Sequence, residues 1–331
     1  MTSIRLERSH QPERSWKLKS KTKSASCLSA FFAAIIANRN GLRRIFFWVL
    51  VAVYTICLPS VIFVFRALNR NFSSEIATKV PFTIILCLAV VYSILCVKKK
   101  RIYACFAVLA FSGIIIFIIM MFQPNVNKHI HIPEYVIMCW VLYKALSIDY
   151  KGSGIYLLIF LCAAMLGIID ELLQGIHPQR FYGWSDMLVN AAASLIGVFT
   201  LMGLKSAPSP DWTWVNHLRR YQESLAVIGV GAGITIVMCI YLFKLQAATG
   251  FWNAYPRWLF GLNSLFLAGA VGMLVYIGRR LLQAPSNPAT PTAESSSAFT
   301  TAHLWIICPL ALLSVMQALV VWVGISGHGF K

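Results

Sequence analysis

Acidic side chains are scarce in this sequence, which has only 11 Asp and Glu residues against 29 Lys and Arg residues. Charged residues of both signs make up 12% of the chain, hydrophobic residues make up 58%, and the mean hydropathy is +0.70. So little charge excludes an ordinary water-soluble globular protein. Strand-length segments that alternate polar and apolar residues are also missing, which argues against a transmembrane barrel. The composition therefore predicts an all-α, polytopic helical membrane protein.

Motifs of the common cofactor and nucleophile sites are missing as well. The nine cysteines are scattered singly without a Cys-x-x-Cys pair, which indicates small buried apolar residues rather than disulfides or a metal cage. No Gly-x-Ser-x-Gly sequence indicates a nucleophilic serine. Gly229-x-x-x-Gly233 lies inside an apolar run and indicates close helix packing instead of a dinucleotide site. We therefore assign no cofactor and no metal, and the sequence leaves open whether the protein is an enzyme.

Apolar runs long enough to cross a bilayer recur along the whole chain. About 20 residues of α-helix span the hydrocarbon core, and a helix satisfies its own backbone hydrogen bonds there. We predict about nine transmembrane helices, of which the fourth is the weakest because it is short and begins beside Glu134. They cover residues 45–65, 80–97, 102–122, 133–148, 154–174, 187–204, 225–245, 258–278 and 304–326.

The positions of the basic residues indicate how these helices are oriented. A formal net charge of +18 would suit a nucleic-acid-binding protein, but the Lys and Arg residues lie in short loops between apolar runs. Such loops are typical of the cytoplasmic side of a membrane protein. Sorting the loops by side favours an N-terminus in the cytoplasm and a C-terminus outside. We expect membrane lipids as partners and no nucleic acid.

Changes in composition divide the chain into four parts. Residues 27–37 of the first part suit an interfacial helix. Pro59 lies inside the first transmembrane helix, 45–65, and is expected to kink it. The last part contains a flexible loop at 281–303, rich in Pro, Ser and Thr. The parts are a basic cytoplasmic arm at 1–44, two transmembrane helices at 45–101, a membrane module at 102–204 and three additional transmembrane helices at 205–331.

Polar residues gather between positions 129 and 190, where acids, histidines and a single arginine interrupt the apolar helices. The predicted topology places them at the outer ends of three helices, so they meet at one membrane face. A lone carboxylate inside a membrane is costly and marks a candidate functional site. Candidates for acid–base chemistry are His131, Glu134 and Glu171. Candidates for binding are Asp170, Gln174, Arg180, Asp186 and Asn190.

Structural roles compete with these assignments. Glu134 follows Pro133 at a helix start, where the helix dipole favours an acid. Asp186 together with Ser185 makes a good N-cap. A salt bridge from Arg180 would explain the acids of the preceding helix. In a functional site, the same guanidinium would bridge carboxylates or hold a phosphate by a two-pronged contact.

Four short motifs resemble the VanZ-like family of bacterial integral membrane proteins over about residues 102–204. In chain order they are His131 with Glu134-Tyr135, Asp170-Glu171-x-x-Gln174, Pro178-x-Arg180 and Asp186-x-x-x-Asn190. The family is named for a protein associated with low-level resistance to the glycopeptide antibiotic teicoplanin. The resemblance implies a bacterial cytoplasmic (inner) membrane. The chain departs from the family by Gln179, where glycine is common, and by three added helices after residue 204.

These observations support several hypotheses of function. The first is a cell-envelope protein that contributes to teicoplanin-type resistance, or handles an envelope lipid or lipid-linked cell-wall precursor, through an outward-facing polar site. The second is a membrane-embedded hydrolase or transferase that acts on a lipid or prenyl-phosphate, with Glu134 or Glu171 as base beside His131. Transport with a titrating acid and a non-catalytic membrane scaffold are the remaining alternatives. The sequence does not indicate an oligomeric state.

Overall fold

The computed structural model describes residues 39–150, 152–177, 179–205, 213–245, 251–283, 293–327 and 330. The chain has two compact units, residues 1–46 and 47–331, and the features below belong to the second. Every regular element in the described residues is helical, which confirms the all-α prediction. The expected interfacial helix at 27–37 and Pro178 of the family-like motif lie outside the described residues.

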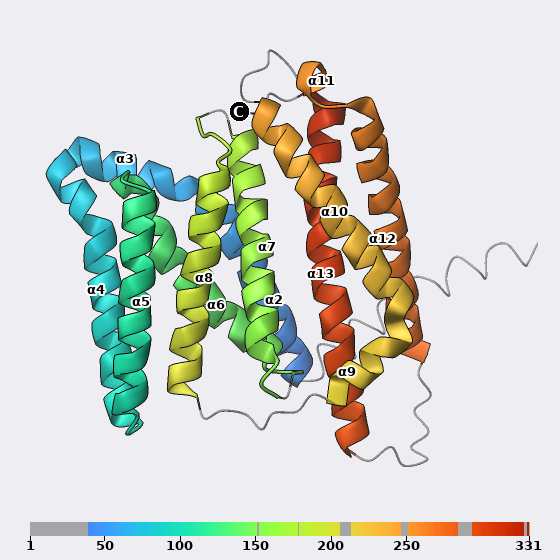
Figure 1. The fold of residues 1–331 in the computed structure, drawn as a ribbon, viewed down its shortest axis with the longest axis horizontal. Coiled ribbons are helices and arrows are strands. Elements are labelled where there is room, and N and C mark those ends of the chain that lie inside the picture. Colours follow the sequence, from blue (N-terminus) through green and yellow to red (C-terminus); the bar gives the residue numbers. More distant parts are fainter. Residues whose placement is uncertain are drawn as a thin grey trace, which may run out of the picture. The chain divides into compact units, whose positions relative to one another are not determined.

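The helices correspond to the apolar runs of the sequence (Figure 1). Within the described residues, eight are long and apolar enough to cross a membrane, as expected for a multi-pass membrane protein. The 3-10 turns are η1 (Leu58–Ser60), η2 (Val126–Ile130) and η3 (Arg219–Tyr221). The α-helices are α2 (Arg39–Cys57), α3 (Val61–Asn71), α4 (Ser74–Lys98), α5 (Ile102–Phe122), α6 (His131–Leu146), α7 (Ile155–Ile176), α8 (Trp184–Leu204), α9 (Thr213–Leu218), α10 (Gln222–Leu245), α11 (Phe251–Ala254), α12 (Arg257–Gln283) and α13 (Ala293–Ser326).

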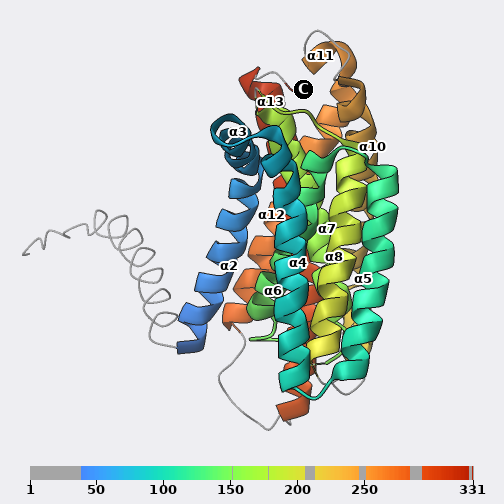
Figure 2. The same ribbon diagram turned by 90° about the vertical axis from the view of Figure 1, so that its left-hand side faces the viewer.

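The helix expected at 45–65 is interrupted at Pro59. This residue lies in η1, because proline has no backbone N–H to donate and its ring clashes with the preceding helical turn. Beyond η1, α3 leaves in a different direction from α2 (Figures 1 and 2). The bend brings Arg66 of α3 to the loop after α7, where its guanidinium donates to the Gln179 side chain.

The short helix α6 packs against both α7 and α8. At its start, His131 lies within 4.8 Å of Asp186, which is in the first turn of α8. Further along, Trp140 Nε1 donates to Thr200 Oγ1 at 3.0 Å, near the end of α8. Helix α6 therefore runs in the same direction as α8 and opposite to α7 (Figure 1).

A glycine on α8 allows α6 to approach closely. A Cβ on Gly197 would lie 2.8 Å from Cys139 Cβ, closer than two carbons tolerate. The expectation of close packing at Gly229 and Gly233 of α10 is wrong, because a Cβ on either would have no neighbour within 4 Å. Gly231, which lies between them, is the glycine that faces α12.

Helix α13 connects the three C-terminal spans to the rest of the second unit. Trp305 Nε1 on α13 donates to the Tyr150 hydroxyl at 3.0 Å, in the loop between α6 and α7. At the opposite end, the ring of Phe330 lies 5.4 Å from that of Tyr182 and covers Gly175 of α7. The C-terminal helices therefore form part of the same packed core as α6, α7 and α8.

The stretch expected to be a flexible loop, residues 281–303, is helical at both ends. Helix α12 continues to Gln283, and α13 already begins at Ala293. No proline or glycine stands between Ala293 and Cys308 to stop a helix, although the composition there is polar. Residues 284–292 lie outside the described residues.

Candidate functional site

The predicted site residues converge where α6 begins, α7 ends and α8 begins. Acids in the first turns of α6 and α8 are favoured by the helix dipole, and those of α7 lie near its C-terminal end. Three helix ends thus bring together side chains that are far apart in the sequence, such as His131 of α6 and Asp186 of α8. Each of the following is at most 7% exposed: His131, Glu134, Asp170, Glu171, Gln174, Asp186 and Asn190.

Glu171 uses both of its carboxylate oxygens in hydrogen bonds. Oε1 accepts from Gln174 Nε2 at 3.0 Å, and Oε2 accepts from the backbone N–H of Gly183 at 3.0 Å. The other end of the Gln174 amide accepts from the Arg180 guanidinium. The Gln174 amide therefore lies between Glu171 and Arg180. The expected salt bridge from Arg180 to an acid of α7 is not among the ion pairs of the described residues.

His131 and Glu134 form a close pair on the first turn of α6. The distance from His131 Nδ1 to Glu134 Oε2 is 3.0 Å, and both side chains are buried. The pair places an imidazole and a carboxylate next to each other on the cavity wall.

Asp170 and Asn190 lie deeper in the helix packing. Asp170 Oδ2 accepts from the Tyr135 hydroxyl at 3.3 Å, and its Oδ1 has no hydrogen-bond partner among the described residues. The Asn190 amide likewise has none in this part of the chain. A Cβ on Gly167 would lie 2.9 Å from Asn190 Cβ, so the amide is held against α7. Both residues are fully buried next to the site and are not among the residues that line the cavity.

Two basic residues of the site were not found from the sequence. Lys128 Nζ in η2 lies 2.6 Å from Asp186 Oδ1 and forms an ion pair with it. Arg66 reaches the site from α3 and donates to Gln179. Lys128 could have been predicted as a site residue from its position next to His129 and His131. Arg66 could not, because no local sequence pattern links α3 to the loop after α7.

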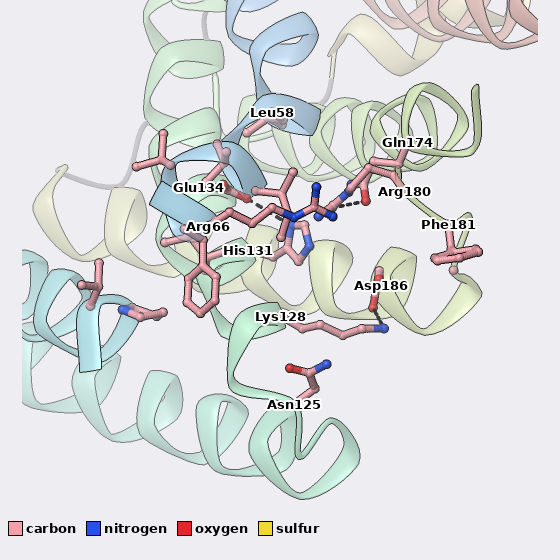
Figure 3. Close-up of a pocket in the computed structure, with 18 of the residues that line it drawn as sticks. Leu58, Arg66, Asn125, Lys128, His131, Glu134, Gln174, Arg180, Phe181 and Asp186 are labelled. Atoms are coloured by element: carbon pink, nitrogen blue, oxygen red, sulfur yellow. Dashed lines mark hydrogen bonds and ion pairs between the residues drawn. The ribbon is translucent and has the colours of Figure 1, made fainter. Parts of the chain in front are cut away.

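The polar residues form one side of a cavity of about 520 Å³ (Figure 3). The labelled cations point toward the acids and amides across it, with Lys128 beside Asp186 and Arg180 beside Gln174. Helices α3 and α4 contribute mostly apolar lining residues, together with Arg66 of α3. Polar lining residues include Arg66, Lys128, His131, Glu134, Arg180 and Asp186, and apolar ones include Val61, Ile62, Phe65, Val80, Pro81 and Ile84.

The two other histidines of this stretch have structural contacts. His129 is 2% exposed, and its Nε2 lies 2.8 Å from the Gln123 carbonyl oxygen at the end of α5. His177 caps the end of α7, where its ring packs edge-on against Phe63 at 5.4 Å. Neither lines the cavity. The sequence-based preference for His131 therefore agrees with its position on the cavity wall.

One subset of the site has the residue types of a metal centre. Ligand atoms of His131, Glu171 and Asp186 all lie within 4.8 Å of one another, and all three side chains are buried. They belong to three different helices, which is why no ligand spacing was visible in the sequence.

No family model, curated protein or solved structure matches this chain. The interpretation of the site therefore rests on its own geometry and chemistry.

Proposed function

We propose that this protein is a multi-pass protein of a bacterial cytoplasmic membrane that binds an anionic phosphate headgroup in the cavity between α3, α4 and the starts of α6 and α8. The bound molecule would be an envelope lipid or a lipid-linked cell-wall precursor. The observation that carries this proposal is a cavity lined both by three cationic side chains, Arg66, Lys128 and Arg180, and by apolar residues of α3 and α4.

The polar wall has the donors that a phosphate requires. Arg66 and Arg180 are each held by the amide of a glutamine, through Gln179 and Gln174 respectively. A guanidinium carries five N–H donors, so one such hydrogen bond leaves others to contact phosphate oxygens. Lys128 adds a third positive charge at the same cavity. Of the three cations, Lys128 is held by an acid, Asp186, which an anionic ligand would replace as its partner.

The apolar wall suits the first part of an acyl or prenyl chain. Its residues come from α3 and α4, which also expose apolar side chains such as Val64 and Leu86. A volume of about 520 Å³ lies within the range of small-molecule sites, roughly 300–1,000 Å³. It accommodates a headgroup and a few methylenes, so the rest of the chain would extend along the outer surface of α3 and α4.

We further propose nine membrane crossings, with the N-terminus inside and the C-terminus outside. Helix α6 has 16 residues, or about 24 Å at 1.5 Å per residue, which is short for a hydrocarbon core of about 30 Å. It nevertheless returns the chain between α5 and α7, which point the same way (Figure 1). With the basic loops inside, the cavity faces the outer side of the membrane. An outward site is where lipid-linked cell-wall precursors are consumed.

The resemblance to the VanZ-like family supports a more specific role. It covers the module at 102–204, which contributes every helix end of the polar cluster. We infer from it a contribution to teicoplanin-type glycopeptide resistance. Precursor binding would explain such a role, because a precursor bound to this protein would be less accessible to the antibiotic at the membrane surface.

Lipid binding tests the proposal directly. The full chain in nanodiscs would be titrated with undecaprenyl phosphate and, separately, phosphatidylglycerol, with binding followed by native mass spectrometry. We expect Arg180→Ala to weaken binding about tenfold or more, since a charge-assisted contact contributes roughly 1.5–3 kcal/mol. Arg70→Ala, on the same α3 as Arg66 but outside the cavity, is the matched control.

Equal binding by the Arg180→Ala variant and the wild-type protein would refute the proposal. Loss of binding by both Arg180→Ala and Arg70→Ala would indicate general surface attraction instead of a site. Loss of abundance in step with loss of binding would favour a scaffold role. Unchanged glycopeptide susceptibility in cells expressing Arg180→Ala would contradict the resistance role alone.

A membrane hydrolase or transferase is the second candidate, and the His131–Glu134 pair favours it. A carboxylate 3.0 Å from an imidazole is a common acid–base arrangement. This candidate requires the same preparations to turn over a prenyl-phosphate or phospholipid, measured as released phosphate or exchanged headgroup. Turnover that persists in His131→Ala would contradict it.

A further inference from the structure

Three side chains of ligand type meet at the inner wall of the cavity from three helices. They are His131 of α6, Glu171 of α7 and Asp186 of α8, and their ligand atoms lie within 4.8 Å of one another. Atoms bound to one tetrahedral ion at about 2.1 Å are roughly 3.4 Å apart. Small side-chain rotations would therefore bring this triangle to ligand distance without moving the helices.

We propose that His131, Glu171 and Asp186 bind a divalent cation of the Zn²⁺ or Mn²⁺ class. One imidazole and two carboxylates are a common ligand set for such ions, whereas Mg²⁺ and Ca²⁺ prefer oxygen ligands alone. Three protein ligands leave a position open for water or another oxygen. The proposal goes beyond phosphate binding and does not depend on it.

Glu134 provides an independent observation that points to such an ion. Its side chain is only 7% exposed, and neither carboxylate oxygen has a hydrogen-bond partner among the described residues. Its Oε2 lies 3.0 Å from His131 Nδ1, without the geometry of a hydrogen bond. A small rotation would let this carboxylate accept Nδ1–H, the contact that fixes the ring orientation of a metal-binding histidine. Glu134 is therefore a positioning residue of the proposed centre.

The charge balance of the cluster also favours a cation. Four carboxyl groups lie in one buried region, and of the three cations at the cavity only Lys128 pairs with one of them. The acids are Glu134, Asp170, Glu171 and Asp186. Lys128 pairs only with Asp186 Oδ1, which leaves Oδ2 of that carboxylate for the ion. Buried uncompensated charge is costly, and a divalent ion compensates two charges at once. Because ligation requires a neutral imidazole, the ion and a proton on His131 exclude each other.

The proposed centre is accessible from the cavity. His131 and Asp186 line it, as does Gly183, whose backbone N–H donates to Glu171. Arg180 and Lys128 line the same cavity as these two ligands.

Metal titration of the full chain in detergent tests the proposal. After removal of metals with a chelator, Zn²⁺ would be added in competition with a chromophoric indicator. We expect one tight equivalent in the wild-type protein. His131→Ala, Glu171→Gln and Asp186→Asn should each weaken it about tenfold or more, and Glu134→Gln about 10- to 100-fold. His177→Ala, which removes a nearby histidine outside the cavity, should bind like the wild-type protein.

A gain of signal separates loss of a ligand from loss of folding. The His131→Cys variant with Co²⁺ should show a sulfur-to-cobalt charge-transfer band that the wild-type protein lacks. A wild-type protein without a tight equivalent of Zn²⁺ or Mn²⁺ would overturn the proposal. Equal affinity in the wild-type protein, His131→Ala and Glu171→Gln would do the same, as would a loss confined to His177→Ala. Lipid binding measured without metal stays a separate result, so either proposal can fail alone.

Discussion

At the scale of single residues, the site depends on one amide that connects two charges. Gln174 donates to Glu171 and accepts from Arg180, so each end of the amide satisfies a charged partner. An amide serves this position better than a second acid, because it can donate and accept at the same time. The arrangement fixes the direction of both charged side chains without neutralising either of them.

Replacing this amide should therefore destabilise the protein more than its size suggests. We expect Gln174→Ala to lower the free energy of unfolding by about 1–3 kcal/mol, since it leaves a buried acceptor and a guanidinium without their partner. Denaturant unfolding of the detergent-solubilised protein measures the effect. Gln222→Ala, at an exposed position at the start of α10, should change stability little. Equal effects of the two substitutions would contradict the role given to Gln174.

At the scale of elements, the approach of α6 to α8 determines where His131 and Glu134 lie. The approach depends on Gly197, where a Cβ would also lie 3.1 Å from the Val136 backbone. Backbone atoms cannot yield as the end of a flexible side chain does. The two helices would have to separate to admit even one methyl group.

A pair of glycine substitutions separates this packing from helix propensity. We expect Gly197→Ala to destabilise the protein by about 1–3 kcal/mol through overpacking. Gly233→Ala should stabilise it by about 0.5–1 kcal/mol, because alanine is the better helix former and meets no neighbour within 4 Å. Unfolding of both variants under the same conditions provides the measurement. A stabilising Gly197→Ala would show that α6 and α8 are less tightly packed than described.

The elements also show what sequence patterns could and could not predict. Eight of the nine expected spans coincide with helices that are long enough to cross, because apolar length alone identifies them. The site acids were found because carboxylates are rare in apolar helices. Arg66 was missed because its contact with Gln179 spans 113 positions and depends on the bend at Pro59. The position of the Gln174 amide between Glu171 and Arg180 was not predicted, because such an arrangement has no characteristic sequence pattern.

At the scale of the whole molecule, the proposed topology makes the two ends of α7 accessible from opposite sides. Phe181 is 71% exposed next to the cavity, whereas Ser153 lies in the loop before α7. We expect Phe181→Cys to react with a membrane-impermeant thiol reagent in intact cells. Ser153→Cys should react only after the membrane is opened, and the parent protein provides the background. The reverse pattern would invert the topology and place the cavity in the cytoplasm.

Two hydrogen bonds hold the loop between α7 and α8 against α7 in the ligand-free protein. Arg180 is bound by Gln174, and the Gly183 N–H is bound by Glu171. Such a preorganised wall loses little conformational entropy on binding, so affinity is not reduced by the ordering of a loop. The consequence is kinetic as well as energetic. The Gly183 amide should exchange its hydrogen slowly in the ligand-free protein, and ligand should associate without a slow closing step.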